Sequence, residues 1–220
     1  MTGTGGNSMT QQAPGRIPMA VKLGYTAFMA ILVPVYWYHY GPTNFLYFCD
    51  VALFLTLAGV WTEKPLLISL PAVGILASQA LWLLDFVFEL AGGQLTGMTA
   101  YMFDPQRPLY LRGLSLFHGW LPILLVYLVM RSGYDRRALW MWTATAWALV
   151  WISFLFLPGP SANHGIGPVN VNYVWGFSDT EPQAWMPPLA WVFTEMAALF
   201  GVLYLPVHLL LRRFAPAAPG

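Results

Sequence analysis

The residues of this sequence that could do chemistry in apolar surroundings are a thiol, an imidazole and three carboxyl groups. Cys49 is the only cysteine, and Asp50 follows it directly inside the apolar run 44–61. Asp85, His118 and Glu195 each lie in another apolar run. An ionisable side chain in such a run costs several kcal/mol unless it is paired, protonated or turned toward a polar cavity. We therefore expect these side chains to be kept for a function.

His118 is the natural proton-transfer group, because an ordinary imidazole titrates near neutral pH. Asp50 or Asp85 beside it would fix the tautomer and stabilise the imidazolium, as the acid of a nucleophilic triad does. Cys49 would be a nucleophile only if His118 took its proton, since the thiolate is the reactive form. The structural alternatives are a histidine that hydrogen-bonds a neighbour and a cysteine that fills a small apolar space.

A metal site is a weaker hypothesis for the same side chains. It would need His118 together with Asp50, Asp85 and Glu195, but no predicted helix supplies two ligands spaced three or four residues apart. The single cysteine excludes an internal disulfide and a cysteine-based zinc cluster. We predict neither a metal nor a cofactor.

Composition places the chain in a membrane. Hydrophobic residues make up 58% of it and charged residues only 9%, whereas a soluble domain has about 25% charged residues. Aromatic residues reach 16%, which is typical of a protein with aromatic belts at two membrane interfaces. A net charge of +1 offers no basic patch, so nucleic acid is not an expected partner and membrane lipid is.

The apolar runs predict an all-α, polytopic bundle of six transmembrane helices. We expect a disordered tail over residues 1–17, the helical domain over 18–213 and a C-terminal tail over 214–220. The run at 44–61 has about 18 residues, enough to cross a bilayer core of ~30 Å. The six predicted helices cover 19–38, 44–61, 66–90, 112–130, 138–157 and 189–211, with a polar connector over 91–111 and a long loop over 158–188.

Basic residues orient the predicted bundle. With a cytoplasmic N-terminus, eight lie on the cytoplasmic side and only Arg107 and Arg112 on the other, which satisfies the positive-inside rule. Both termini are then cytoplasmic, in the inner membrane of a bacterium. The eight are Arg16, Lys22, Lys64, Arg131, Arg136, Arg137, Arg212 and Arg213.

This topology gives the intramembrane polar residues a common depth. Asp50, His118 and Glu195 follow the outer ends of their helices by about six residues, and Asp85 precedes one by about five, so all fall within roughly 10 Å of the outer boundary. We expect one polar cavity near the periplasmic side; the alternative is that each acid snorkels or bonds a nearby hydroxyl. Asn170, Asn172 and Tyr173 of the long loop would line or cap this cavity, or belong to a plain surface loop.

Three short motifs carry a family resemblance: Phe48-Cys49-Asp50, His118-Gly119 and Asn172-Tyr173. With the six-helix layout, they resemble the pattern of YwaF-like bacterial integral membrane proteins, a group that includes proteobacterial membrane-associated proteins. More distantly, they resemble eukaryotic acyltransferases of ether phospholipids and the androgen-induced-gene type of fatty-acid ester hydrolase. The resemblance implies an intramembrane nucleophile at Cys49 and a base at His118. The long connector and the acids Asp85 and Glu195 depart from the family pattern.

Two classes of function follow from these observations. One is an intramembrane acyl-lipid transferase or hydrolase that uses Cys49 and His118 on an acyl-lipid substrate. The other is a non-enzymatic membrane protein, either a proton-coupled carrier or a scaffold that binds a lipid or a partner. Labelling of Cys49 by an activity-based probe favours the first, and uptake that depends on Asp50 and a pH gradient favours the second.

Overall fold

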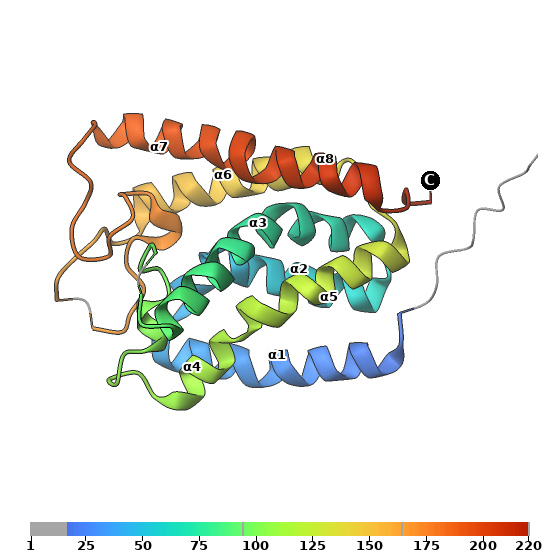
Figure 1. Cartoon of the computed structure of the whole chain (residues 1–220), viewed down its shortest axis with the longest axis horizontal. Coiled ribbons are helices and arrows are strands. Elements are labelled where there is room, and N and C mark those ends of the chain that lie inside the picture. The colour runs from blue at the N-terminus through green and yellow to red at the C-terminus, as the bar shows by residue number, and fades with distance from the viewer. Residues whose placement is uncertain (1–16, 94, 164, 220) are drawn as a thin grey trace, which may run out of the picture.

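The computed structural model describes residues 17–93, 95–163 and 165–219, which form an all-helical bundle (Figure 1). The predicted tail lies outside these residues except for Ile17. All η elements are 3-10 turns, apart from η4, which is a π-helical segment. The elements are α1 (Met19–Tyr40), η1 (Pro42–Leu46), α2 (Phe48–Thr62), α3 (Pro65–Leu90), η2 (Ala100–Met102), α4 (Leu109–Ser115), α5 (Phe117–Ser132), α6 (Ala138–Phe156), η3 (Val171–Tyr173), α7 (Pro188–Ala198), η4 (Leu199–Tyr204) and α8 (Leu205–Phe214).

Five helical segments within the described part of the chain are long and apolar enough to cross a membrane. Large apolar side chains such as Ile31, Ile123, Phe156 and Val202 are exposed on the outside of the bundle. A helical protein with such a surface satisfies its backbone internally and meets hydrocarbon with its side chains. The five segments are Met19–Tyr40, Pro65–Leu90, Leu109–Ser132, Ala138–Phe156 and Pro188–Phe214.

The second predicted helix is shorter than its apolar run. The chain turns at Gly41, where φ is 75°, makes the short η1 turn and is extended at Tyr47, so α2 begins only at Phe48 and has 15 residues. At ~1.5 Å per residue α2 is about 22 Å long, less than the ~30 Å of a bilayer core. The prediction of an 18-residue spanning helix over 44–61 is therefore wrong in length, because its first residues form a turn.

Two other predicted helices are interrupted. The fourth begins at Leu109 rather than Arg112 and breaks at Leu116, so that α4 and α5 follow one another. Pro122 has no backbone N–H for the carbonyl of His118, four residues earlier, which weakens the first turns of α5. The sixth helix runs as α7, η4 and α8, and Pro206 follows the π-helical segment at the second residue of α8.

Helix α3 lies at the centre of the bundle and packs against α2, α5 and α6. Its closest approach is at Gly74, where a Cβ atom would lie 1.9 Å from Cε2 of the buried Trp142 on α6. Small residues at such crossings let helices approach in lipid, where tight packing replaces the hydrophobic effect as the source of association. Gly74 is thus required by the contact between α3 and α6.

Both ends of the described chain lie at the same end of the bundle (Figure 1). The C-terminal segment is held there by a bridge between Tyr134 and Ala217, and the Tyr134 hydroxyl lies 2.7 Å from Nδ1 of His208. A partly buried ion pair between Lys22 and Glu63 joins α1 to the end of α2. The opposite end carries the connector after α3 and the long loop after α6, and the candidate site lies beneath these two segments.

Candidate functional site

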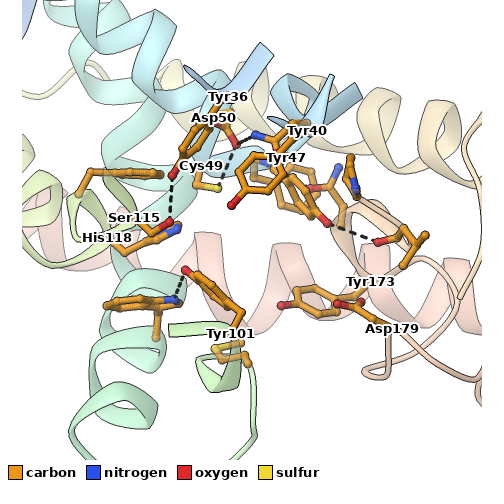
Figure 2. Close-up of a pocket in the computed structure, with 18 of the residues that line it drawn as sticks. Tyr36, Tyr40, Tyr47, Cys49, Asp50, Tyr101, Ser115, His118, Tyr173 and Asp179 are labelled. Carbon is orange, nitrogen blue, oxygen red and sulfur yellow. Dashed lines mark hydrogen bonds between the residues drawn. The ribbon is translucent and has the colours of Figure 1, made fainter. Parts of the chain in front are cut away.

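A cavity of about 260 Å³ lies at the end of the bundle remote from the chain termini (Figure 2). Its walls come from α1, α2, α3 and α5, and its cover comes from the connector and the long loop. Of the residues predicted to form a site, five line this cavity: Cys49, Asp50, His118, Asn172 and Tyr173. The volume is just below the ~300–1,000 Å³ of drug-sized ligand sites, which suits a small polar ligand or the headgroup of a lipid.

Asn172 fixes the start of α2 and hence the positions of Cys49 and Asp50. Its Oδ1 accepts a hydrogen bond of 3.0 Å from the backbone N–H of Phe48, and its Nδ2 donates to the carbonyl of Leu46 at 2.9 Å. The side chain thus caps a helix about 124 residues earlier in the chain, a role that a residue at the helix N-terminus ordinarily plays. Asn172 and Tyr173 adopt left-handed backbone conformations, with φ of 62° and 67°, which are uncommon outside glycine and cluster at functional sites.

Asp50 is almost completely buried, with 3% of its surface exposed. Its Oδ2 accepts a hydrogen bond from Nδ2 of Asn44 at 3.3 Å, and the Cys49 thiol lies 3.8 Å from the same oxygen. Its other oxygen, Oδ1, is buried and has no hydrogen-bond partner among the described residues. A half-satisfied carboxyl group in such a place is costly to the fold. Asp50 therefore contributes unused hydrogen-bonding capacity to the cavity.

His118 is held by an amide and two aromatic rings. Its Nδ1 lies 2.7 Å from Oε1 of Gln79, so the imidazole donates its proton there and leaves Nε2 as the basic nitrogen. The ring stacks on Trp82 at 4.9 Å and lies 4.1 Å from the ring of Phe117. The expected acid beside His118 is thus a neutral amide, which fixes the tautomer without adding a negative charge.

Cys49 and His118 come from different helices to the same cavity, and Figure 2 shows Cys49 beside Asp50 and His118 beside Ser115. Over the residues that the structure describes, no hydrogen bond joins the thiol to the imidazole. The groups share a cavity without forming a preassembled pair. Catalytic hydrogen bonds of this kind often tighten only when substrate is bound.

Asp85 does not line the cavity, which contradicts the prediction from depth. Its carboxylate stabilises the fold of the connector, because Oδ1 accepts hydrogen bonds from the backbone N–H groups of Thr96 and Gly97 at 2.6 and 3.1 Å. Oδ2 accepts the backbone N–H and the hydroxyl of Thr99 at 2.9 and 2.7 Å. The sequence placed Asp85 at the correct end of the bundle but could not show that it faces the connector.

Glu195 and Asn170 also lie outside the cavity lining. Glu195 is on α7, where its Oε2 is buried with no hydrogen-bond partner among the described residues. Asn170 folds the long loop: its Nδ2 donates to the carbonyls of Gly176 and Ser178 at 2.8 and 3.0 Å. The prediction that these four residues share one depth therefore holds for the cavity in part. Asp50 and His118 line it, whereas Asp85 and Glu195 do not.

Much of the cavity lining consists of residues that the sequence did not single out. Gln79 and Trp82 lie one helical turn apart on α3. Gln79 could have been recognised from the sequence, because it is a neutral amide within an apolar run. Two phenols that the sequence reasoning did not select also line the cavity, Tyr47 just before α2 and Tyr101 of the connector, beside the predicted Tyr173. Burial raises the pKa of each of these hydroxyls, so they stay neutral and can donate hydrogen bonds at physiological pH.

Arg107 is the basic residue of the cavity lining. Its guanidinium lies 5.3 Å from the ring of Tyr101 and 5.9 Å from that of Tyr40, and its Nη1 donates to the Tyr40 hydroxyl at 3.4 Å. Its Nε is buried without a hydrogen-bond partner among the described residues, and the nearby Asp104 Oδ2 is 3.8 Å away. No group of three His, Cys, Asp or Glu side chains within the described ranges could hold a metal ion.

The fold and the site define a class: an all-helical protein with several membrane-crossing helices and a polar, aromatic-lined cavity at one end of the bundle. A particular family is not assigned by comparison with known proteins. The chain matches no protein-family model, no curated protein and no solved structure.

Proposed function

We propose that the protein is an intramembrane enzyme that transfers or hydrolyses the acyl group of a lipid ester, with Cys49 as nucleophile and His118 as base. The observation that carries this proposal is that the only cysteine and the one histidine of the cavity lining converge on it from two helices. The resemblance of their motifs to YwaF-like proteins agrees with these roles.

The reaction would begin when the basic Nε2 of His118 takes the thiol proton of Cys49. The sulfur then bonds to the ester carbonyl carbon, and the lipid alkoxide leaves with the proton from His118. Water, or the hydroxyl of a second lipid, next attacks the acyl-cysteine, gives its proton to His118 and restores the thiol. Gln79 keeps Nε2 free for these steps, and the neutral phenols of the cover can donate hydrogen bonds to the carbonyl oxygen.

Acyl transfer should be measured with the purified full-length protein in lipid nanodiscs, using a phospholipid with a labelled acyl chain. We expect Cys49→Ala and His118→Ala each to lower turnover about 100-fold or more. Ser78→Ala is the matched control, because Ser78 lines the cavity but its hydroxyl bonds the backbone carbonyl of Ile75 at 3.1 Å. Equal turnover in wild type and both variants would end the nucleophile assignment.

A non-enzymatic carrier or lipid-binding scaffold is the second candidate, and Asp50 favours it. An isolated carboxyl group with an unsatisfied buried oxygen is the kind of group that binds and releases a proton in transporters. Uptake driven by a pH gradient and abolished by Asp50→Asn, but unchanged in Cys49→Ala, would select this candidate. Turnover that depends on Cys49 would select the enzyme.

For the membrane arrangement we propose six crossings, with α2 as a short one, and both chain termini in the cytoplasm of a bacterium. Two features support it: the described ends lie together, and the basic residues of that end outnumber those of the other. The cavity then opens toward the periplasmic face of the inner membrane. A lipid ester there would lie close to the headgroup region, at the level of Cys49.

A further inference from the structure

We infer that the cavity binds the headgroup of a zwitterionic phospholipid, with its ammonium group at Asp50 and its phosphate at Arg107. This assignment rests on the proposed function for the lipid nature of the ligand and deepens it by naming the headgroup. It is carried by the buried Asp50 and the partly buried Arg107, which line one cavity without pairing with each other. Each has a buried polar atom with no hydrogen-bond partner among the described residues.

The acidic half of the site is Asp50. Its Oδ1 has no hydrogen-bond donor among the described residues, although only 3% of the residue's surface is exposed. A carboxylate removed from water is stable when a cation and further donors satisfy it. An ammonium group supplies both the charge and the donors. Tyr36, Tyr40 and Tyr47 line the cavity around Asp50, and aromatic rings beside a carboxylate are the usual surroundings of a bound ammonium.

The basic half of the site is Arg107. The rings of Tyr40 and Tyr101 flank its guanidinium, and its buried Nε donates to no acceptor among the described residues. Asp104 forms a partly exposed ion pair with Arg107, but its Oδ2 lies 3.8 Å from Nε, beyond hydrogen-bond range, so the Nε–H donor remains available for an anion. Guanidinium groups bind phosphate through several parallel N–H donors.

Asp50 and Arg107 line one cavity without an ion pair between them, which favours a ligand that carries both charges. In low-dielectric surroundings a carboxylate and a guanidinium attract strongly, yet no ion pair joins Asp50 to Arg107 within the described residues. Asp50 is held on α2 by Asn44, and Arg107 is held in the connector by Tyr40. An ammonium joined to a phosphate supplies donors to the unsatisfied Oδ1 of Asp50 and an acceptor to the unsatisfied Nε of Arg107, whereas a ligand with one charge satisfies only one of them. Asp179 also lines the cavity and adds a second acidic group to its cover.

Binding should be measured by calorimetry on the full-length protein in detergent, with Cys49→Ala as the background so that no turnover occurs. The probes are dihexanoyl phosphatidylethanolamine, dihexanoyl phosphatidylglycerol, which lacks the ammonium, and free phosphoethanolamine, which lacks the chains. We expect phosphatidylethanolamine to bind at least 10-fold more tightly than phosphatidylglycerol. Weaker binding of phosphoethanolamine identifies a lipid as the ligand, and equal binding identifies a soluble zwitterion.

Two variants and one control separate the contribution of the ammonium contact from that of the phosphate contact. Asp50→Asn should reduce phosphatidylethanolamine binding about 10-fold or more and leave phosphatidylglycerol unchanged, and Arg107→Gln should weaken both. Glu195→Gln removes a buried carboxyl outside the cavity and should change neither. Equal affinity of the two lipids for the background protein overturns the assignment, whether or not Asp50→Asn folds. Selective binding without turnover in wild type leaves the headgroup assignment standing and removes the proposed enzyme.

Discussion

Gln79 decides what the imidazole of His118 can do. It is buried on α3, and its Oε1 lies 2.7 Å from Nδ1 of His118. We predict that Gln79→Leu lowers the free energy of unfolding by about 1–3 kcal/mol, because it leaves a buried imidazole N–H without an acceptor. The measurement is an SDS titration in mixed micelles.

Two comparisons separate the hydrogen bond from the packing. Gln79→Glu keeps an acceptor and should recover most of the loss. Ser78→Ala at the adjacent position should change stability little. A Gln79→Leu protein as stable as wild type would show that the amide does not hold His118.

At the scale of single residues, a polar side chain in an apolar run correctly predicted burial, but it did not predict which neighbouring segment the side chain faces. Cys49, Asp50 and His118 were selected from the sequence, and the structure brings all three to one cavity. Asp85 was selected by the same reasoning but faces the connector. Depth depends on the position of a residue along its helix, which a sequence gives. The facing side depends on helix rotation within the bundle, which neighbouring helices decide.

At the scale of elements, the long loop governs the start of α2 through Asn172. We predict that Asn172→Gly lowers the free energy of unfolding by about 0.5–2 kcal/mol, since it removes the cap of Phe48 and keeps a residue suited to positive φ. Asn172→Ala should cost about 1 kcal/mol more, because it adds the strain of a left-handed alanine. Unfolding in mixed micelles tests both variants. If Asn172→Gly matched wild type, α2 would not depend on the cap.

Gly74 tests the packing of α3 on α6. A Cβ at this position would lie 1.9 Å from Trp142, which is completely buried. We predict that Gly74→Ala destabilises the protein by about 1–3 kcal/mol through overpacking. Gly24→Ala is the matched control, because a Cβ there meets nothing within 4 Å; alanine also favours a helix, so that variant should be neutral or slightly stabilising. Equal stability of the two variants would contradict the close crossing.

Helix existence was predictable at this scale, and helix ends were not. Apolar length alone located all the long helices, because a membrane helix needs about 20 such residues. The start of α2 depends on Asn172, distant in sequence, and the break at Leu116 falls inside the predicted helix 112–130. Neither signal is local, so the predicted helix at 44–61 was too long and the one at 112–130 began too late.

At the scale of the whole molecule, composition was sufficient for the class. Few charges and many apolar residues predicted a helical membrane protein, and the structure has five helices of the required length and composition. The number of crossings was less accessible, because it depends on whether the 15-residue α2 traverses the membrane. An apolar segment of that length is shorter than a typical spanning helix and longer than a typical buried core helix.

Reporter fusions distinguish six crossings from five. If α2 crosses, a reporter after Thr43 should report the periplasm and one after Lys64 the cytoplasm; fusions after Arg137 and Phe214 should also be cytoplasmic, and one after Asn163 periplasmic. If α2 does not cross, the two points that flank it fall on the same side, and the C-terminus moves to the face opposite the N-terminus.

Alkaline phosphatase is active only in the periplasm and a fluorescent protein chiefly in the cytoplasm, so the pair reports each point twice. We expect the six-crossing pattern, because it keeps the basic residues at the ends of α1, α5 and α8 on one face. Cytoplasmic signals after both Thr43 and Asn163 would invert the bundle and place the cavity, with its inferred headgroup site, on the opposite face.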